Sequence, residues 1–518
     1  MDPTVVKLGF ETHQAEIVSR FGEEAKYNES GFCPHHPGLC RLRKRNALGF
    51  WVELLPYCPF CFEEWKDKMS ASASTVTPPP PVQQTPLFDR STNYVHQPSH
   101  TDVEALKTAS SSAASVKALQ KVRPTAHDDE AGRTIKAQAG GIAAILTAMK
   151  AHTVVEEQAC AGLRVLAVND ENEIAIARAN GIAAILTAMK AHTAETTVQK
   201  QACAALRKLA ANNDNKVAIA RANGIAAILT AMNAHTAVAT VQKQACGALR
   251  NLAYNNDDNK VGIARANGIA AILKAMKAHT AVATVQKEAC AALRNLAANN
   301  DNQVAIARAN GIAAILTAMN THTAVATVQE QACAALQNLA PNSDNKVAIA
   351  RANGIAAILE AMKAHTAVAT VQKQACGALQ NLACKNDDNQ VAIARANGIS
   401  AILTAMNAHT AVATVQKQAC GALQILAANN NDNQVAIARA NGIAAILTAM
   451  NAHTAVATVQ EQACGALRNL AINDDNKVGI ARANGTSAIL TAMNAHTAVA
   501  TVQKQACGAL QILSLIHI

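Results

Sequence analysis

Apolar and polar residues follow helical spacing over most of the chain, and they do so in blocks that repeat. A segment that begins with Gly-Ile, or with a close variant of it, recurs at Gly141, Gly181, Gly224, Gly268, Gly311, Gly354, Gly398, Gly442 and Gly485. The first interval is 40 residues long, and each later interval is 43 or 44 residues long. Self-similarity at a fixed period of this length predicts a solenoid of stacked units.

The pattern predicts three helices in each unit. In the unit around residue 224, a short first helix is expected at Lys216–Ala222. Asp214 and Asn215 stand where an N-cap residue belongs, ahead of this helix. Asn223 and Gly224 follow it and supply a left-handed stop.

Two longer helices complete the predicted unit. The second is expected at 225–234, because its apolar residues fall on one helical face. The third is expected to begin with Thr240 as its cap, since apolar residues keep helical spacing from there on. In two units the start of this helix, Thr327–Glu330 and Thr458–Glu461, also matches a capping box.

One unit cannot form a stable fold alone. Its few large aliphatic side chains bury too little surface to offset the conformational entropy lost on ordering the unit. The units must therefore stack, and their many Ala and Gly residues let successive layers approach closely.

These features resemble the armadillo repeat family. The short first helix, the junction ANGIAAIL and the third-helix sequence VQKQACGALRNLA carry the resemblance, which covers residues 102–513. HEAT repeats are the nearest alternative, but they lack the separate short first helix and the glycine turn. The resemblance implies an all-α fold, a right-handed superhelix of about nine three-helix repeats. It also implies that the third helices line a concave groove for extended peptides or partner domains.

Composition divides the chain into four parts. Residues 1–68 form a small N-terminal module, and residues 69–101 are a disordered linker rich in Pro, Ser and Thr. Residues 102–513 are the solenoid, which starts with a helical half-unit at Asp102–Val122. The tail at 514–518, SLIHI, resembles a reading frame continued into a sequencing adapter. We therefore expect a non-native tail and a natural protein that extends further.

The third-helix face opposite the core is the predicted binding surface. The resemblance places a partner-binding Asn at Asn251, and an amide can donate to and accept from a partner backbone. Val165, Lys208, Ile425 and Ile512 replace it in four units. The candidate groove residues are Lys200, Arg207, Lys243, Arg250, Asn251, Lys287, Arg294, Asn295, Asn338, Lys373, Asn381, Lys417, Arg468 and Asn469.

Charge narrows the class of partner. The predicted groove carries twelve basic residues against Glu157, Glu330 and Glu461, and the whole chain has a net charge of +10. This favours extended acidic or phosphorylated protein segments, and the alternative is that the basic stripe is only solvated surface. Import receptors of the family carry a Trp where this chain has Gly247 or Ala291, and a basic import signal would be repelled.

Other classes of function are disfavoured. We expect no nucleic-acid ligand, because aromatic residues make up 3% of the chain and only Tyr254 lies beyond residue 100. Phosphate-binding glycine loops, HExxH and nucleophile elbows are absent from the sequence, so we expect no enzyme. There is no secretory signal and no long apolar run. We expect a monomer in the cytoplasm, the nucleus or both, without membrane insertion.

Two columns of residues could suggest metal or redox chemistry. Nine Cys recur in register, from Cys160 to Cys507, and nine His follow the second helices, among them His235. We interpret the Cys as small apolar helix residues, because packed helices lie too far apart for disulfides. The His, one per layer, are better suited to helix C-caps than to metal binding.

The N-terminal module has the spacing of a structural zinc site. Cys33-x2-His36 and Cys58-x2-Cys61 are two candidate knuckles, and zinc prefers four such ligands. Cys40 or His35 could replace His36, and free thiols are the alternative. The spacing weakly resembles a zinc-ribbon or treble-clef module. The favoured function is a non-enzymatic scaffold. The alternative is the substrate-binding subunit of a ubiquitin ligase, with this module recruiting the E2.

Overall fold

The structure is a computed structural model that describes residues 25–32, 40–45, 51–53, 137–151 and 155–515. The chain divides into two compact units, residues 1–93 and 94–518. The predicted zinc ligands Cys33, His36, Cys58 and Cys61, the linker 69–101 and the half-unit 102–122 lie outside the described residues.

A small antiparallel sheet is described in the first unit. It contains β1 (Ala25–Phe32), β2 (Cys40–Arg45) and β3 (Trp51–Glu53), in the order β1-β2-β3. Residue 27 pairs with residue 42 and residue 44 with residue 52, and the register shifts between residues 28 and 32. This sheet lies outside residues 102–513, for which the helical solenoid was predicted.

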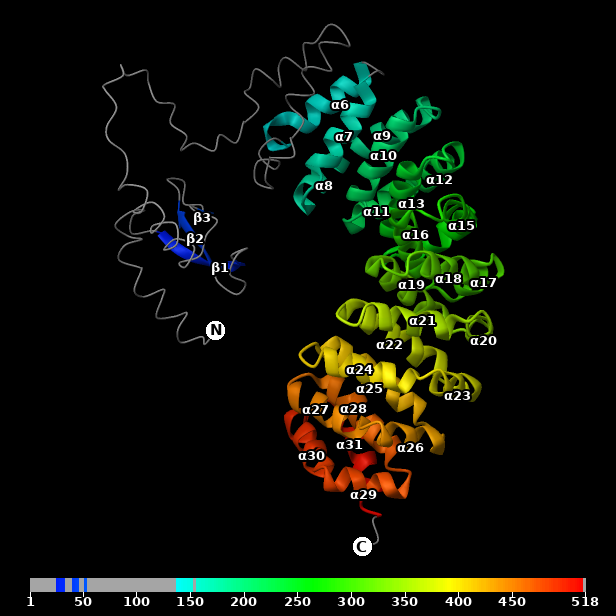
Figure 1. Cartoon of the computed structure of the whole chain (residues 1–518). Coiled ribbons are helices and arrows are strands. Elements are labelled where there is room, and N and C mark those ends of the chain that lie inside the picture. The colour runs from blue at the N-terminus through cyan, green and yellow to red at the C-terminus, as the bar shows by residue number, and fades with distance from the viewer. Residues whose placement is uncertain (1–24, 33–39, 46–50, 54–136, 152–154, 516–518) are drawn as a thin grey trace, which may run out of the picture. The chain divides into compact units, whose positions relative to one another are not determined.

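Helices in groups of three fill the described part of the second unit (Figure 1). A short π-helix, η1 (Ala137–Gly141), precedes them. The first helices are α8 (Asp170–Arg178), α11 (Asn213–Arg221), α14 (Asp257–Arg265), α17 (Asn300–Arg308), α20 (Ser343–Arg351), α23 (Asp387–Arg395), α26 (Asn431–Arg439) and α29 (Asp474–Arg482). The second helices are α6 (Ile142–Ala151), α9 (Gly181–Ala191), α12 (Gly224–Ala234), α15 (Gly268–Ala278), α18 (Gly311–Thr321), α21 (Gly354–Ala364), α24 (Gly398–Ala408), α27 (Gly442–Ala452) and α30 (Gly485–Ala495).

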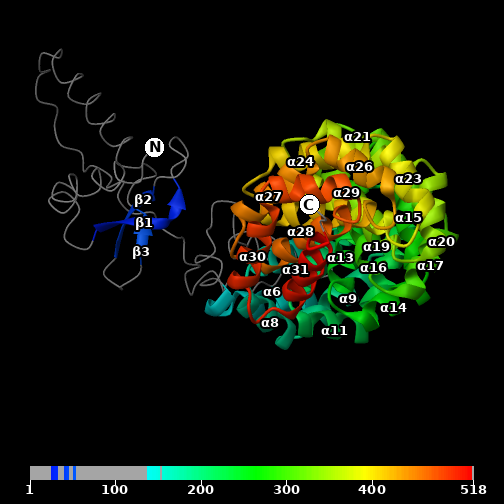
Figure 2. The same cartoon turned by 90° about the horizontal axis from the view of Figure 1, so that it is seen from below.

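The third helices form the spine of the solenoid. They are α7 (Glu156–Leu166), α10 (Thr196–Leu209), α13 (Ala239–Ala253), α16 (Ala283–Leu296), α19 (Ala326–Leu339), α22 (Ala369–Ala383), α25 (Ala413–Leu426), α28 (Ala457–Leu470) and α31 (Ala500–Leu513). Each packs along its counterpart in the next layer, and seen along the stack they lie towards the inside of the coil (Figure 2). The predicted right-handed superhelix of three-helix repeats is confirmed.

Aliphatic residues and Ala form one continuous core through the layers. In the layer of α12 and α13, Ile228, Val241 and Leu249 are fully buried, and Met232 is nearly so. Ala245 and Cys246 are fully buried beside them. The scarcity of aromatic residues thus corresponds to an interior that small side chains fill between closely packed helices.

Two residues, Asn223 and Gly224, form the junction between the first and second helices, and each has a different role. Asn223 adopts the left-handed conformation, with φ 60°. Gly224 is needed for space instead, because a Cβ there would lie 2.4 Å from Ile219 Cγ2 and 2.7 Å from the Ile219 carbonyl oxygen. The predicted left-handed stop is confirmed, with Asn as the left-handed residue.

Three predicted helix caps are wrong. The N-cap of α11 is Asn212, whose side chain accepts from the backbone N–H groups of Asp214 and Asn215. The third helix α13 begins at Ala239 after Val238, which gives no side-chain cap, so Thr240 lies inside the first turn.

The capping boxes are replaced by contacts between layers. Glu330 Oε2 accepts from Thr370 Oγ1 of the next layer at 2.9 Å, and Glu461 Oε2 accepts from Thr501 Oγ1 at the same distance. A glutamate near the start of a third helix therefore meets the threonine of the following unit rather than its own backbone.

The Cys and His columns are structural, as predicted. The nine Cys of the column are unpaired, and all except Cys507 are buried. Burial raises the pKa of Cys290 to about 12. His235 is the C-cap of α12, and its Nε2 donates to the Thr193 carbonyl of the preceding layer at 2.8 Å. An arginine also recurs in the last turn of the first helices, as Arg221 does in α11.

Among the described residues, no single helix is long and apolar enough to cross a membrane. Three pairs, each made of a first helix and the second helix that follows it, reach that length and composition together, but each pair is bent by 68–72°.

Candidate partner-binding groove

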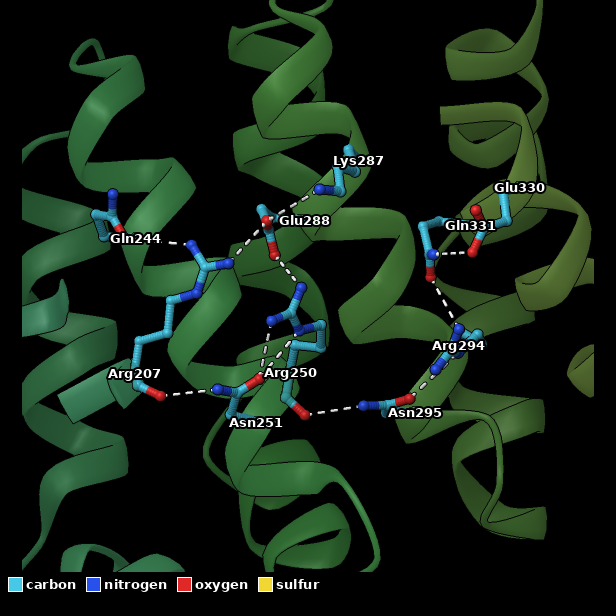
Figure 3. Close-up of polar contacts among 10 residues, drawn as sticks. All are labelled: Arg207, Gln244, Arg250, Asn251, Lys287, Glu288, Arg294, Asn295, Glu330 and Gln331. Carbon is cyan, nitrogen blue, oxygen red and sulfur yellow. Dashed lines mark hydrogen bonds and ion pairs between the residues drawn. The ribbon is translucent and has the colours of Figure 1, made fainter. Parts of the chain in front are cut away.

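All fourteen predicted groove residues lie on third helices, in columns that run from layer to layer. In α13 the lysine of the column, Lys243, lies two turns before Arg250 and Asn251. All three residues are half-buried. On α10, α13 and α16 these columns are close enough to share polar contacts (Figure 3).

The asparagine column joins consecutive layers. Asn251 Nδ2 donates to the Arg207 carbonyl at 2.7 Å, and Asn295 Nδ2 donates to the Arg250 carbonyl at 2.9 Å. Asn338, Asn381 and Asn469 make the same contact with the layer before theirs. The accepting carbonyls lie in the last turn of a helix, where no intrahelical donor is available. The amide donors expected to hold a partner thus hold the solenoid together. The Oδ1 atoms of Asn251, Asn295 and Asn469 accept from the arginine that precedes each of them. The Oδ1 atoms of Asn338 and Asn381 remain as acceptors.

A network of arginines and acceptors spans four layers (Figure 3). Arg207 Nη2 and Arg250 Nη1 both reach Glu288, at 3.1 Å and 2.6 Å from its two carboxylate oxygens. Lys287 Nζ lies 3.9 Å from the same carboxylate. In the next layer, Arg294 Nη1 donates to Gln331 Oε1 at 2.9 Å.

Glu288 is the groove residue that the sequence analysis missed. The other third helices carry glutamine at this position: Gln158, Gln201, Gln244, Gln331, Gln374, Gln418, Gln462 and Gln505. Aligning the units would have revealed the glutamate among these glutamines. The acidic groove residues were counted only in the neighbouring column, which contains Lys287. Glu288 adds a fourth acidic residue to the three counted from the sequence.

Burial and the nearby carboxylate act on the pKa of Arg250 in opposite directions. Burial lowers the pKa of Arg250, and the nearby Glu288 carboxylate raises it. An arginine stays charged in either case. The Glu288 carboxylate therefore offsets part of the positive charge of Arg207 and Arg250.

The basic charge is not uniform along the stack. Arg207, Arg250 and Arg294 occupy one column in α10, α13 and α16, where α19, α22 and α25 carry Gln337, Gln380 and Gln424. The lysine column, Lys200, Lys243 and Lys287, lies beside the arginines in the same three layers. Among the described residues, Lys200 and Lys243 have no hydrogen bond or ion pair. The region of α10, α13 and α16 therefore concentrates the available positive charge.

A second set of lysines lies away from the groove. Lys190, Lys277 and Lys363 are exposed near the ends of the second helices α9, α15 and α21. Each lines a cleft between its own second helix and the second helix of the next layer. These residues offer the same charge as the groove lysines on a different surface.

Zinc is not tested by this part of the chain. Within the described residues, no group of three or more His, Cys, Asp or Glu is placed to hold a metal ion. The four predicted ligands in residues 1–68 lie outside them, so the zinc site stays a prediction.

Family models match most of the solenoid. The model described as LRRK2 ARM repeat matches residues 207–394 and 344–517, and the model described as Armadillo/beta-catenin-like repeat matches residues 169–211. Among curated proteins, the sequence comparison gives no match.

Of two similar solved structures, the first shows the same fold. One comes from work on a phosphorylation switch that controls the interaction between cadherin and beta-catenin; it is 19% identical, with a TM-score of 0.59, over 80% of each chain. An engineered protein is 28% identical over 47% of this chain and 96% of its own, with a TM-score of 0.43.

Proposed function

Because the chain belongs to the armadillo repeat family, we propose that its solenoid is a protein-binding scaffold for an extended acidic or phosphorylated segment. The segment would lie along the third helices, where the family resemblance implies the concave groove. The observation that carries this proposal is the concentration of basic side chains on α10, α13 and α16.

The spacing of the layers suits an extended chain. Packed helices lie about 8–10 Å apart, and three residues of an extended chain span about 10 Å. A segment with an acidic residue at every third position would therefore meet one lysine of the groove in each layer. Lys200, Lys243 and Lys287 are the three consecutive lysines that such a segment would meet.

The polar surroundings support the same class of ligand. The Oδ1 atoms of Asn338 and Asn381 remain as acceptors for backbone N–H groups, because the Nδ2 atoms are bound to the preceding layers. Lysine ammonium groups on α10, α13 and α16 would provide the charge, and the asparagine acceptors on α19 and α22 would hold the backbone where the segment continues along the stack. This combination binds a protein segment without demanding a particular side chain at each position.

Charge reversal on the groove tests the proposal. The variant K200E/K243E/K287E is compared with K190E/K277E/K363E, which makes the same change in charge on the second helices. The probe is a fluorescent extended peptide with glutamate at every third position, and its glutamine counterpart is the reference. We expect the groove variant to bind the acidic peptide at least about tenfold more weakly, with little change in the control. Equal loss in both variants would reject a specific groove.

The ubiquitin-ligase alternative depends on residues 1–68. Transfer of ubiquitin from a loaded E2, measured with the full chain, distinguishes the two functions. Discharge that depends on Cys58 and Cys61 would favour the ligase, and its absence would leave the scaffold.

A further inference from the structure

We propose that Glu288 is an internal competitor for the acidic partner, occupying the Arg207–Arg250 pair that would otherwise bind an acidic side chain. This inference rests on the proposed scaffold function. It concerns what limits the affinity of the groove, and it assigns that role to one residue.

Glu288 and the two arginines that it binds differ in exposure. The Glu288 side chain is 3% exposed, whereas those of Arg207 and Arg250 are 24% and 25% exposed. The carboxylate is thus far less exposed than the two arginine side chains that converge on it (Figure 3). Two arginines from successive layers converge on one carboxylate, an arrangement that a partner's carboxylate or phosphate could share.

Gly247 makes this convergence possible. Arg207 on α10 must pass over α13 to reach Glu288 on α16. A Cβ at position 247 would lie 2.8 Å from both Cδ and Nε of Arg207, so the arginine lies where an alanine side chain would be.

The neighbouring layers show the effect of alanine at this position. Ala291 and Ala334 stand in the column of Gly247 on α16 and α19. The arginines that precede them, Arg250 and Arg294, bond acceptors in their own layer and in the next one. Among these three arginines, a contact two layers away is thus found only where the next third helix carries glycine.

An internal carboxylate reduces what an external one can gain. A partner carboxylate near Arg207 and Arg250 must share the same donors with Glu288, or displace it from them. Either event costs charge-assisted hydrogen bonds that already exist. The uncompensated Lys200, Lys243 and Arg294 would then contribute most of the attraction in the wild-type groove.

The variant Glu288→Gln tests the inference with little risk to the fold. Eight other third helices carry glutamine at this position, so the side chain fits the layer. Glu330→Gln is the matched control, because it makes the same change in charge on the adjacent layer α19 at a position that pairs with Thr370. Gly247→Ala adds a second route, since it displaces Arg207 from Glu288 while keeping the charge constant.

The probe is the fluorescent peptide with glutamate at every third position, and binding is measured to the full chain at fixed salt. We expect Glu288→Gln to bind about tenfold more tightly, and Glu330→Gln at most about twofold more tightly. Gly247→Ala should fall between them, because it frees one of the two arginines.

The outcomes separate the two proposals. If wild type prefers the acidic peptide over the glutamine peptide but Glu288→Gln binds no better than Glu330→Gln, Glu288 is not a competitor and the scaffold stands. Weaker binding by Glu288→Gln would also overturn the inference, because Glu288 would then be positioning the arginines for the partner. If neither wild type nor Glu288→Gln distinguishes the two peptides, the scaffold proposal fails.

Discussion

The side-chain amide of Gln242 donates to the backbone carbonyl of His235 at 2.8 Å, and so closes the end of the helix before its own. The same nitrogen also donates to the Met232 carbonyl at 2.8 Å. Equivalent pairs of hydrogen bonds occur in each described layer from Gln199 to Gln503. A buried glutamine thus satisfies the Met232 carbonyl, which α12 leaves without an intrahelical donor. It also gives a second donor to the His235 carbonyl, which accepts from the Val238 N–H at 3.0 Å.

Replacing this glutamine should weaken a layer. Gln286 is 2% exposed and bonds Met276 and His279. Gln286→Ala leaves the Met276 carbonyl unpaired, whereas the His279 carbonyl keeps the backbone N–H of Val282 at 3.0 Å. We expect a loss of about 1–3 kcal/mol in the free energy of unfolding, measured by urea denaturation. Gln503→Ala, at the half-buried position of the last described layer, should cost less. Equal losses would mean that burial of the carbonyls does not determine the effect.

The asparagine column should contribute to stability before any partner binds. Asn338→Ala removes the hydrogen bond to the Arg294 carbonyl, and we expect a loss of about 1 kcal/mol in the free energy of unfolding. Asn407→Ala, on the exposed side of α24, is the control and should change little. If the two variants are equally stable in urea, the contact between layers is not a stabilising one.

A buried carboxyl should make stability depend on pH. Burial raises the pKa of Glu173 to about 7, and the Asn212 N–H that donates to its Oε2 at 3.0 Å opposes the shift. An unfolded glutamate titrates near pH 4.3. Between about pH 4.3 and pH 7, Glu173 therefore stays protonated in the folded state but loses its proton in the unfolded state. Stability attributable to this group is therefore present below about pH 4.3 and is lost as the pH rises towards 7.

Glu173→Gln removes that loss. The variant should exceed wild type by about 2 kcal/mol in free energy of unfolding at pH 8 and show little difference at pH 4.5. Urea denaturation at the two pH values measures this, with Glu195→Gln at an exposed position as the control. A gain of equal size at both pH values would contradict the assigned cause.

The zinc prediction is open to direct measurement. The full chain should carry about one zinc ion, measured by elemental mass spectrometry after dialysis, because four Cys and His ligands complete a structural site. Cys58→Ser/Cys61→Ser should lose the metal, whereas Cys507→Ser, at an exposed position on α31, should retain it. Wild-type protein without zinc would eliminate the site.

The local features of the fold could be predicted from the sequence. A period of 43 or 44 residues predicted the stacking, and Asn-Gly at each junction from Asn180-Gly181 onwards predicted the turn between the first and second helices. The apolar register placed Cys246 and its counterparts in the interior. These conclusions held because helix periodicity and turn conformation depend on residues within a few positions of one another.

The sequence by itself therefore determined the repeat, the helices of each unit and the columns that face the groove. Only the tertiary structure decided which groups those columns meet, because the contacts join residues of different layers. Asn251 donates to a carbonyl 44 residues earlier, and Glu330 binds a threonine 40 residues later rather than its own helix end. Glu288 is a further example. The sequence shows a glutamate in a column of glutamines, but the two arginines that bind it lie 38 and 81 residues away along the chain. The packing of three layers brings those charges together.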